Sequence, residues 1–191
     1  TMRFGEDLSM ECPENAGRIA RIARRLALLA RLLGLLLVPA LAVQWALGAN
    51  GGGLNLPVPV MEALHGQALT PLQRLGGFIA LAPSALALAV ALFALARICG
   101  EYARGALFSG AVLQGYRRLG WSLAATTVLH WLQPTLVALA VTLGLPPGQR
   151  LLVVGVSSDD LVLGLVTAVV FLLGAVMGVA RDLQEDNAAI V

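Results

Sequence analysis

The sequence predicts an all-α membrane protein with four transmembrane helices, an N-terminal amphipathic basic helix and both termini in the cytoplasm. Of the 191 residues, 58% are hydrophobic and only 13% are charged, whereas about 25% of the residues of a soluble domain are charged. Four long apolar blocks follow one another, each near the ~20 residues that cross ~30 Å of hydrocarbon. All 13 basic residues counted as Lys or Arg are arginine, and most lie on one side of these blocks. We therefore expect lipid to be the solvent of most of the chain.

Residues 1–25 are predicted to be a cytoplasmic tail followed by the amphipathic helix. The first 15 residues are polar and acidic without an apolar period, and we expect them to be a mobile tail. From residue 16, apolar residues such as Ile19 and Ile22 share one face at 100° per residue, and arginines such as Arg18 and Arg21 fall on the other. The arginines either anchor the first span on the cytoplasmic side or recognise anionic lipid or an acidic partner.

Residues 26–191 are predicted to be the four-helix transmembrane domain. The expected spans are residues 26–47, 78–96, 119–145 and 161–180. Arg31 lies inside the first span, near enough to the surface for its side chain to snorkel to the headgroups.

The placement of arginine predicts the orientation. Only Arg74 and Arg150 lie on the side that we assign to the outside of the cell. The other 11 arginines flank the opposite ends of the spans, which is the positive-inside pattern. Both termini and the connector between the second and third spans should therefore be cytoplasmic.

The two outer connectors contain signals for helix starts and for strands. Thr70 and Pro71 suit the N-cap and first turn of the second span. Ser157 to Asp160 suit the start of the fourth, which explains the acidic pair better than cation binding does. The sequences LNLPVPV, from residue 54, and LLVVGV, from residue 151, are expected to be short strands that pair on the outer face.

The third span carries a cluster of polar residues around Thr127, His130 and Gln133. His130 and Gln133 are three residues apart and therefore neighbours on one helical face. The cluster forms interhelical hydrogen bonds, handles a proton or ligand, or ligates haem; a second histidine at membrane depth, which bis-histidine haem needs, is not evident. We expect no catalytic, cofactor-binding or metal-binding residues, because paired carboxylates and metal-ligand motifs are not found within the spans.

The middle connector and the last span contain glycine signals. Five glycines recur every five residues from Gly100 to Gly120, a spacing that places them on no common helical face. We expect a helix to end near Gly105 and Ser109 to cap the next. The pair Gly174 and Gly178, and the alanines of the second span, predict close helix contacts.

The second half of the chain resembles a known family. The phrases GALFSGAVLQGYRRLGW, SSDDLVLGLV and ARDLQEDNAAIV resemble the bacterial integral membrane proteins of the Domain of Unknown Function 2975 family. The matching positions are Gly105, Phe108, Ser109, Arg118, Gly120 and Glu185. The resemblance implies four spans in the bacterial cytoplasmic (inner) membrane and no assigned reaction. It also implies a small helix-turn-helix regulator encoded beside the gene, although the tail residues 186–189 depart from the family pattern.

These observations together predict a non-enzymatic accessory or interaction protein. It would be a subunit of a larger membrane complex or the membrane partner of a regulator, with the bilayer and a protein as partners and without cofactor or direct nucleic acid binding. The alternative is a small transporter or sensor built around His130. The candidate cytoplasmic interaction surface consists of Arg104, Phe108, Ser109, Tyr116, Arg117, Arg118 and Glu185.

Overall fold

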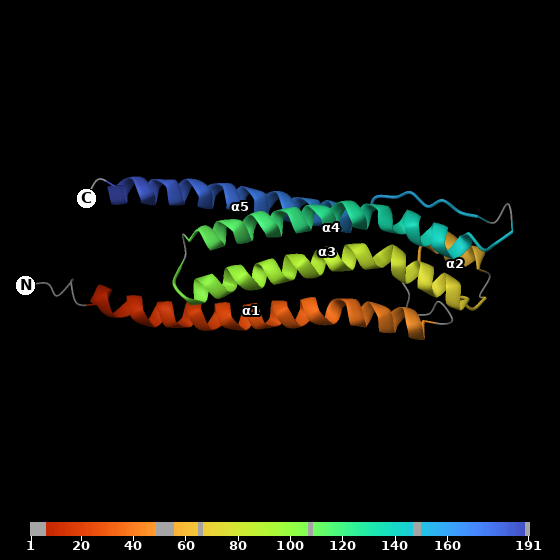
Figure 1. Ribbon diagram of the computed structural model, residues 1–191, viewed down its shortest axis with the longest axis horizontal. Helices are drawn as coiled ribbons and strands as arrows, with labels where there is room; N and C mark the ends of the chain where they lie inside the picture. The colour runs from red at the N-terminus through yellow and green to blue at the C-terminus, as the bar shows by residue number, and fades with distance from the viewer. Residues whose placement is uncertain (1–6, 49–55, 65–66, 107–108, 147–149, 190–191) are drawn as a thin grey trace, which may run out of the picture.

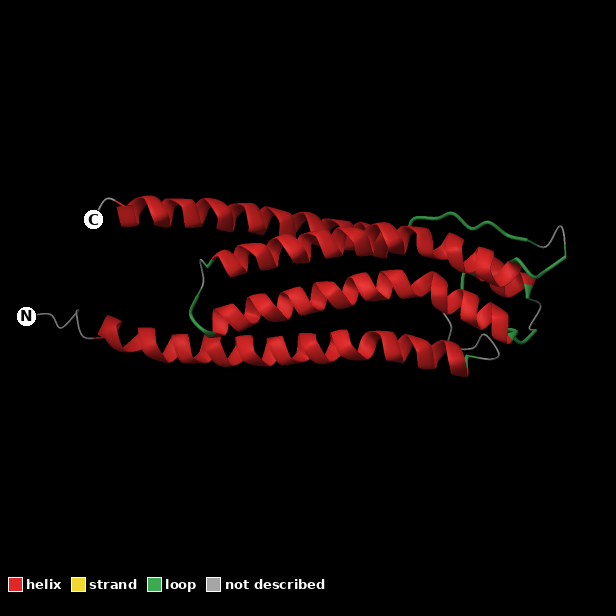
Figure 2. Ribbon diagram, in the orientation of Figure 1, coloured by secondary structure: helices red, strands yellow, loops and turns green. Residues whose placement is uncertain are grey.

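A computed structural model describes residues 7–48, 56–64, 67–106, 109–146 and 150–189 of the chain. The described residues form four long helices and one short helix, with no strand among them (Figure 2). The long helices contain four segments that are long and apolar enough to cross a membrane: Ala20–Leu47, Pro71–Ala103, Gly110–Thr142 and Ser158–Leu183. The expectation of an all-α chain with four spans is confirmed, and the helices make it a multi-pass membrane protein.

Helix α1 runs from Asp7 to Leu47 without interruption. The polar, non-periodic sequence predicts a mobile tail up to residue 15, and this prediction is wrong for residues 7–15, which are helical. A polar helix without an apolar face has no hydrophobic period, and so the pattern could not reveal it. The basic segment and the first span are therefore two parts of one helix.

The short helix α2, Val58–Ala63, replaces one of the two expected strands. Pro57 occupies the N-cap and Pro59 the first turn, where a missing N–H costs nothing. The other expected strand, from Leu151, pairs with a helix and not with another strand. The hydroxyl of Thr135, which lies in the helix Gly110–Thr142, donates to the Val153 carbonyl at 2.6 Å. The expected strand pair is thus wrong for the described residues.

The remaining helices begin where capping residues are predicted. Helix α3, Pro71–Ala103, starts with a capping box in which Thr70 and Gln73 satisfy each other's backbone N–H groups. Helix α4, Gly110–Thr142, has Ser109 as its N-cap. Between them Gly105 adopts a positive φ of 78°, which confirms the predicted helix end. Helix α5 covers Ser158–Ala189.

The long helices lie side by side in the order α1, α3, α4, α5 (Figure 1). In the part of the chain that the structure describes, α1 runs beside α3 alone and α5 beside α4 alone among the helices. The helices therefore form an open row and not a closed four-helix bundle. Helix α1 begins and α5 ends at the end of the row where α3 joins α4, which we call the α3–α4 end. The opposite end, which carries α2, is the α2 end.

Small residues on both sides of α3 allow the close packing of this row. Ala96 and Cys99 contact Ala27 and Ala30 of α1. Ala91, Ala94 and Ile98 pack on the other side against Val112, Leu119 and Leu123 of α4. Gly174 and Gly178 of α5 lie against Tyr116 and Leu113 of α4. Without a hydrophobic driving force between helices in lipid, such close backbone approach supplies the van der Waals attraction.

At the α2 end, a second core forms around Trp45 of α1. The Trp45 side chain is only 4% exposed and clusters with Val60, Leu69 and Val141. Its ring lies directly on Gly77 of α3, where a methyl group would overlap the ring. Gly77 thus creates the space that lets α1 and α3 enclose a tryptophan.

We predict that Gly77→Ala destabilises the protein by about 1–3 kcal/mol, because the added methyl group overpacks the contact with Trp45. Thermal unfolding of the purified protein in detergent measures the effect. The control is Gly164→Ala, since nothing lies within 4 Å of a methyl group at that position. Equal melting temperatures for the two variants would contradict the contact.

Candidate functional site

The polar residues predicted on the third span all lie on α4 and contact neighbouring helices. Thr127 and His130 reach α5, whereas Gln133 reaches α3. The Thr127 hydroxyl lies 3.3 Å from that of Thr167. The Gln133 side-chain oxygen accepts a hydrogen bond from Ser84 at 3.5 Å. The three residues therefore do not form a single site, because successive turns of α4 face different neighbours.

His130 pairs with an acidic residue that sequence spacing did not associate with it. Its Nδ1 atom lies 2.7 Å from Oδ1 of Asp160, at the start of α5. The Asp160 side chain is 8% exposed and the His130 side chain 42% exposed. The pair is consequently enclosed on the aspartate side and open on the histidine side.

Asp160 is also part of the cap of α5. Its Oδ2 atom accepts hydrogen bonds from the Ser157 backbone N–H at 2.7 Å and the Ser157 hydroxyl at 2.9 Å. In return, Ser157 accepts from the Asp160 backbone N–H at 3.2 Å. This is the reciprocal arrangement of a capping box. The Asp160 carboxylate is thus already engaged by hydrogen-bond donors of the protein. No cluster of metal-ligating side chains occurs among the described residues.

The position of Asp160 in the sequence determines how far along the row of helices its pair with His130 lies. Helix α5 begins opposite His130, about three turns before α4 ends at Thr142. The extended segment from Leu151 runs back along those turns, with its backbone N–H donating to the Thr142 hydroxyl at 3.2 Å. The His130–Asp160 pair therefore lies well inside the row of helices and not at its end.

The described residues of the predicted cytoplasmic surface lie near the α3–α4 end but do not share one role. Ser109 caps α4, and the half-buried Tyr116 lies with its hydroxyl 2.9 Å from that of Tyr102 on α3. Arg104 is exposed and pairs with Glu101 at 2.6 Å. Arg117 and Arg118 are exposed on α4. Phe108 and the side chain of Glu185 lie outside the part that the structure describes.

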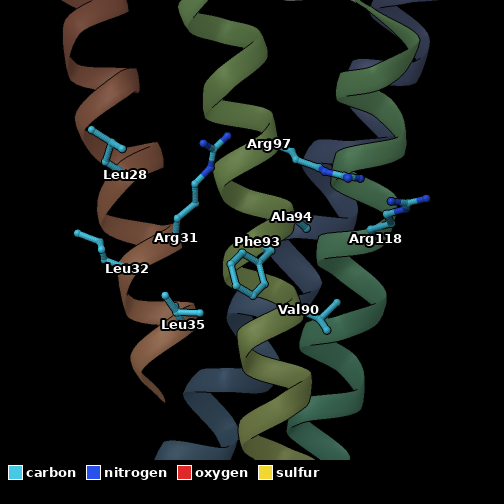
Figure 3. A pocket seen from close by; sticks show the side chains of 9 residues that line it. All are labelled: Leu28, Arg31, Leu32, Leu35, Val90, Phe93, Ala94, Arg97 and Arg118. Carbon is cyan, nitrogen blue, oxygen red and sulfur yellow. The ribbon is translucent and has the colours of Figure 1, made fainter. Parts of the chain in front are cut away.

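Arg118 also lines a groove that the sequence pattern did not predict. Arg31 of α1, Arg97 of α3 and Arg118 of α4 line the same groove, which has a volume of about 630 Å³ (Figure 3). Its other lining residues are apolar: Leu28, Leu32, Leu35, Val90, Phe93 and Ala94. We call it the arginine groove. A signal was available, since each arginine stands within or beside an apolar block, but their convergence needs the packing of three helices.

The family model described as protein of unknown function (DUF2975) matches residues 54–191. The chain belongs to this family. The match begins after α1 and includes helices α2 to α5. No curated protein and no solved structure matches the chain. Membership of the DUF2975 family is thus established, whereas it assigns no activity.

Most of the described positions that carry the DUF2975 resemblance serve the fold. Gly105 makes the turn after α3, and Ser109 caps α4. Gly120 lies against the ring of Phe171. That ring packs edge-on against Trp121, with 5.8 Å between the two ring centroids. Arg118 differs from these, because it lines the arginine groove.

We predict that Asp160→Ala lowers stability more than His130→Ala does. The aspartate variant loses both the cap of α5 and the contact with His130, at a cost of about 1–3 kcal/mol. The histidine variant loses one hydrogen bond, about 1 kcal/mol, and leaves Ser157 on the carboxylate. Denaturation measures the free energy of unfolding of both variants. The reference is Asp159→Ala, which changes an exposed residue next to Asp160. An Asp160→Ala variant as stable as Asp159→Ala would refute the assignment.

Proposed function

We propose that this DUF2975 protein is a non-enzymatic membrane protein that acts through a protein partner, with both termini in the bacterial cytoplasm. It serves as an accessory subunit of a larger membrane complex or as the membrane partner of a regulator. The orientation is supported by the arginines at the α3–α4 end, which match the positive-inside rule.

The observation that carries this proposal is the open row of helices. Helix α5 packs on α4 through Gly174 and Gly178, and its opposite side is lined with large apolar residues. These residues recur at helical spacing along the whole span: Leu161, Leu165, Leu172, Val176, Val179 and Leu183. A further helix could lie along this stripe, which we call the α5 stripe.

The use of the polar residues also supports an interaction role. Thr127, His130 and Gln133 are engaged in contacts between helices, which stabilise the packing of spans in lipid. In contrast, Arg117 is exposed at the α3–α4 end, where a cytoplasmic partner could reach it. The α5 stripe and Arg117 would then provide an intramembrane contact and a surface contact for the same partner.

A photoreactive amino acid in place of Leu172 tests the proposal in intact membranes. We expect a cross-linked product of defined mass, and the same product from Val179, because both side chains lie on the α5 stripe. Leu36 on α1 is the control, since it is exposed to a similar extent, 58% against 63% for Leu172. Cross-linking to lipid alone at Leu172, Val179 and Arg117 would overturn the proposal.

A second candidate function is a small transporter or sensor, favoured by the open side of the His130–Asp160 pair. The half-exposed imidazole of His130 could exchange a proton or contact a ligand while Asp160 orients it. Trp131, the next residue, is exposed and provides a fluorescent reporter.

This second candidate predicts a pH-dependent change of tryptophan fluorescence that His130→Ala abolishes while the melting behaviour stays that of a folded protein. Thr127→Ala is the control, because it removes a neighbouring interhelical contact on α4 without a titratable group. A fluorescence response that is identical in wild type and His130→Ala would exclude the sensor.

A further inference from the structure

The arginine groove contains three positive charges for which the described residues supply no counter-ion. In the described part of the chain, the side chains of Arg31, Arg97 and Arg118 form no ion pair or hydrogen bond. Glu101, which lines the adjoining pocket, is already paired with Arg104. Unpaired charges within membrane helices are costly and commonly mark binding sites.

The depth of the groove corresponds to the boundary between hydrocarbon and headgroups. On α3, the stretch between Arg74 and Arg97 contains no charged residue and spans about 34 Å at 1.5 Å per residue. This length is close to the ~30 Å hydrocarbon thickness of a bilayer. Arg97 and Arg74 thus stand at the two boundaries, and Arg97 lies at the level of lipid phosphates.

The three side chains line the same groove at this level. In Figure 3, Arg97 extends from α3 toward Arg118 on α4. Arg31 extends from α1 beside α3 toward the same end of the groove, on the side of α3 away from Arg118. Guanidinium groups bind phosphate through paired N–H donors, so this arrangement suits a phosphate group better than a neutral headgroup.

The remainder of the groove suits an acyl chain. Leu32 and Leu35 of α1 and Val90 and Phe93 of α3 line it beside the arginines, and all four side chains are exposed. They continue from the arginines toward the α2 end, into the depth of the membrane. A free phosphate ion or an acidic protein segment would leave this apolar lining unused, whereas a phospholipid fills both parts.

We propose that the arginine groove binds one anionic phospholipid. Its phosphate lies at Arg97 and Arg118, with Arg31 lining the same groove from α1, and an acyl chain runs along the apolar lining formed by α1 and α3. This inference goes beyond the proposed function and does not depend on it. The bound lipid would join α1 to α3 and α4 at a level where the residues that the structure describes form no ion pair between them.

Native mass spectrometry of the full chain in detergent tests the site with phosphatidylglycerol and phosphatidylcholine of equal acyl chains. We expect one tightly retained phosphatidylglycerol per chain and little phosphatidylcholine. The triple variant Arg31→Gln/Arg97→Gln/Arg118→Gln should bind phosphatidylglycerol at least about tenfold more weakly, since charged hydrogen bonds are lost. The control Arg18→Gln/Arg21→Gln/Arg25→Gln removes the same charge from exposed positions of α1 and should retain the lipid.

Two further measurements separate the possible ligands. Val90→Trp fills the apolar part of the groove while leaving the arginines in place, and it should also weaken retention of phosphatidylglycerol. Glycerol 3-phosphate at millimolar concentration, which has the phosphate but no acyl chain, should not displace the lipid. Equal weakening in both triple variants, no effect of Val90→Trp, or displacement by glycerol 3-phosphate would each overturn the proposal. If the triple variant does not fold, the single variants Arg97→Gln and Arg118→Gln replace it.

Discussion

The constraint on which this structure depends is that hydrocarbon provides no hydrogen bonds. Every polar group inside the span must therefore find a partner within the protein. The buried side chains of the described residues meet this requirement: Ser122 and Thr126 donate to carbonyls of the preceding turn of α4, and Asp160 accepts from His130 and Ser157. No described buried side-chain nitrogen or oxygen lacks a hydrogen bond. The interhelical contacts around His130 follow from this constraint before any functional role is considered.

The same solvent explains why the helices can form a row. In water, an open row would expose apolar side chains at high cost, but lipid tails cover them at no penalty. Association then depends on close approach, and Ala96, Gly115 and Gly174 provide it at three successive helix pairs. A row leaves two helix edges and a broad face available, which distinguishes this DUF2975 protein from a closed bundle. The α5 stripe and the arginine groove both result from that openness.

Arginine has two roles in this chain. Residues such as Arg18 and Arg21 are exposed at the start of the first span, where the positive-inside rule counts them toward a cytoplasmic location. Arg31, Arg97 and Arg118 come from three different helices and reach one groove. The same residue type thus follows the positive-inside pattern in one place and supplies the phosphate-binding groups of our proposal in the other. Counting arginines along the sequence detects the first role but not the second.

The sequence by itself determined the number of spans, the helix start signals at Thr70, Ser109 and Ser157, and the helix end near Gly105, because hydropathy and capping are local properties. It did not reveal the polar helix before residue 16, where a periodic signal is absent, or the start of helix α2 at Val58, where LNLPVPV predicted a strand. Only the tertiary structure decided which neighbour each polar residue contacts. The pairing of His130 with Asp160, the separation of Gln133 from it and the convergence of three arginines depend on the rotation and vertical offset of packed helices. Those variables are set by contacts between side chains far apart in sequence, such as Trp45 on Gly77.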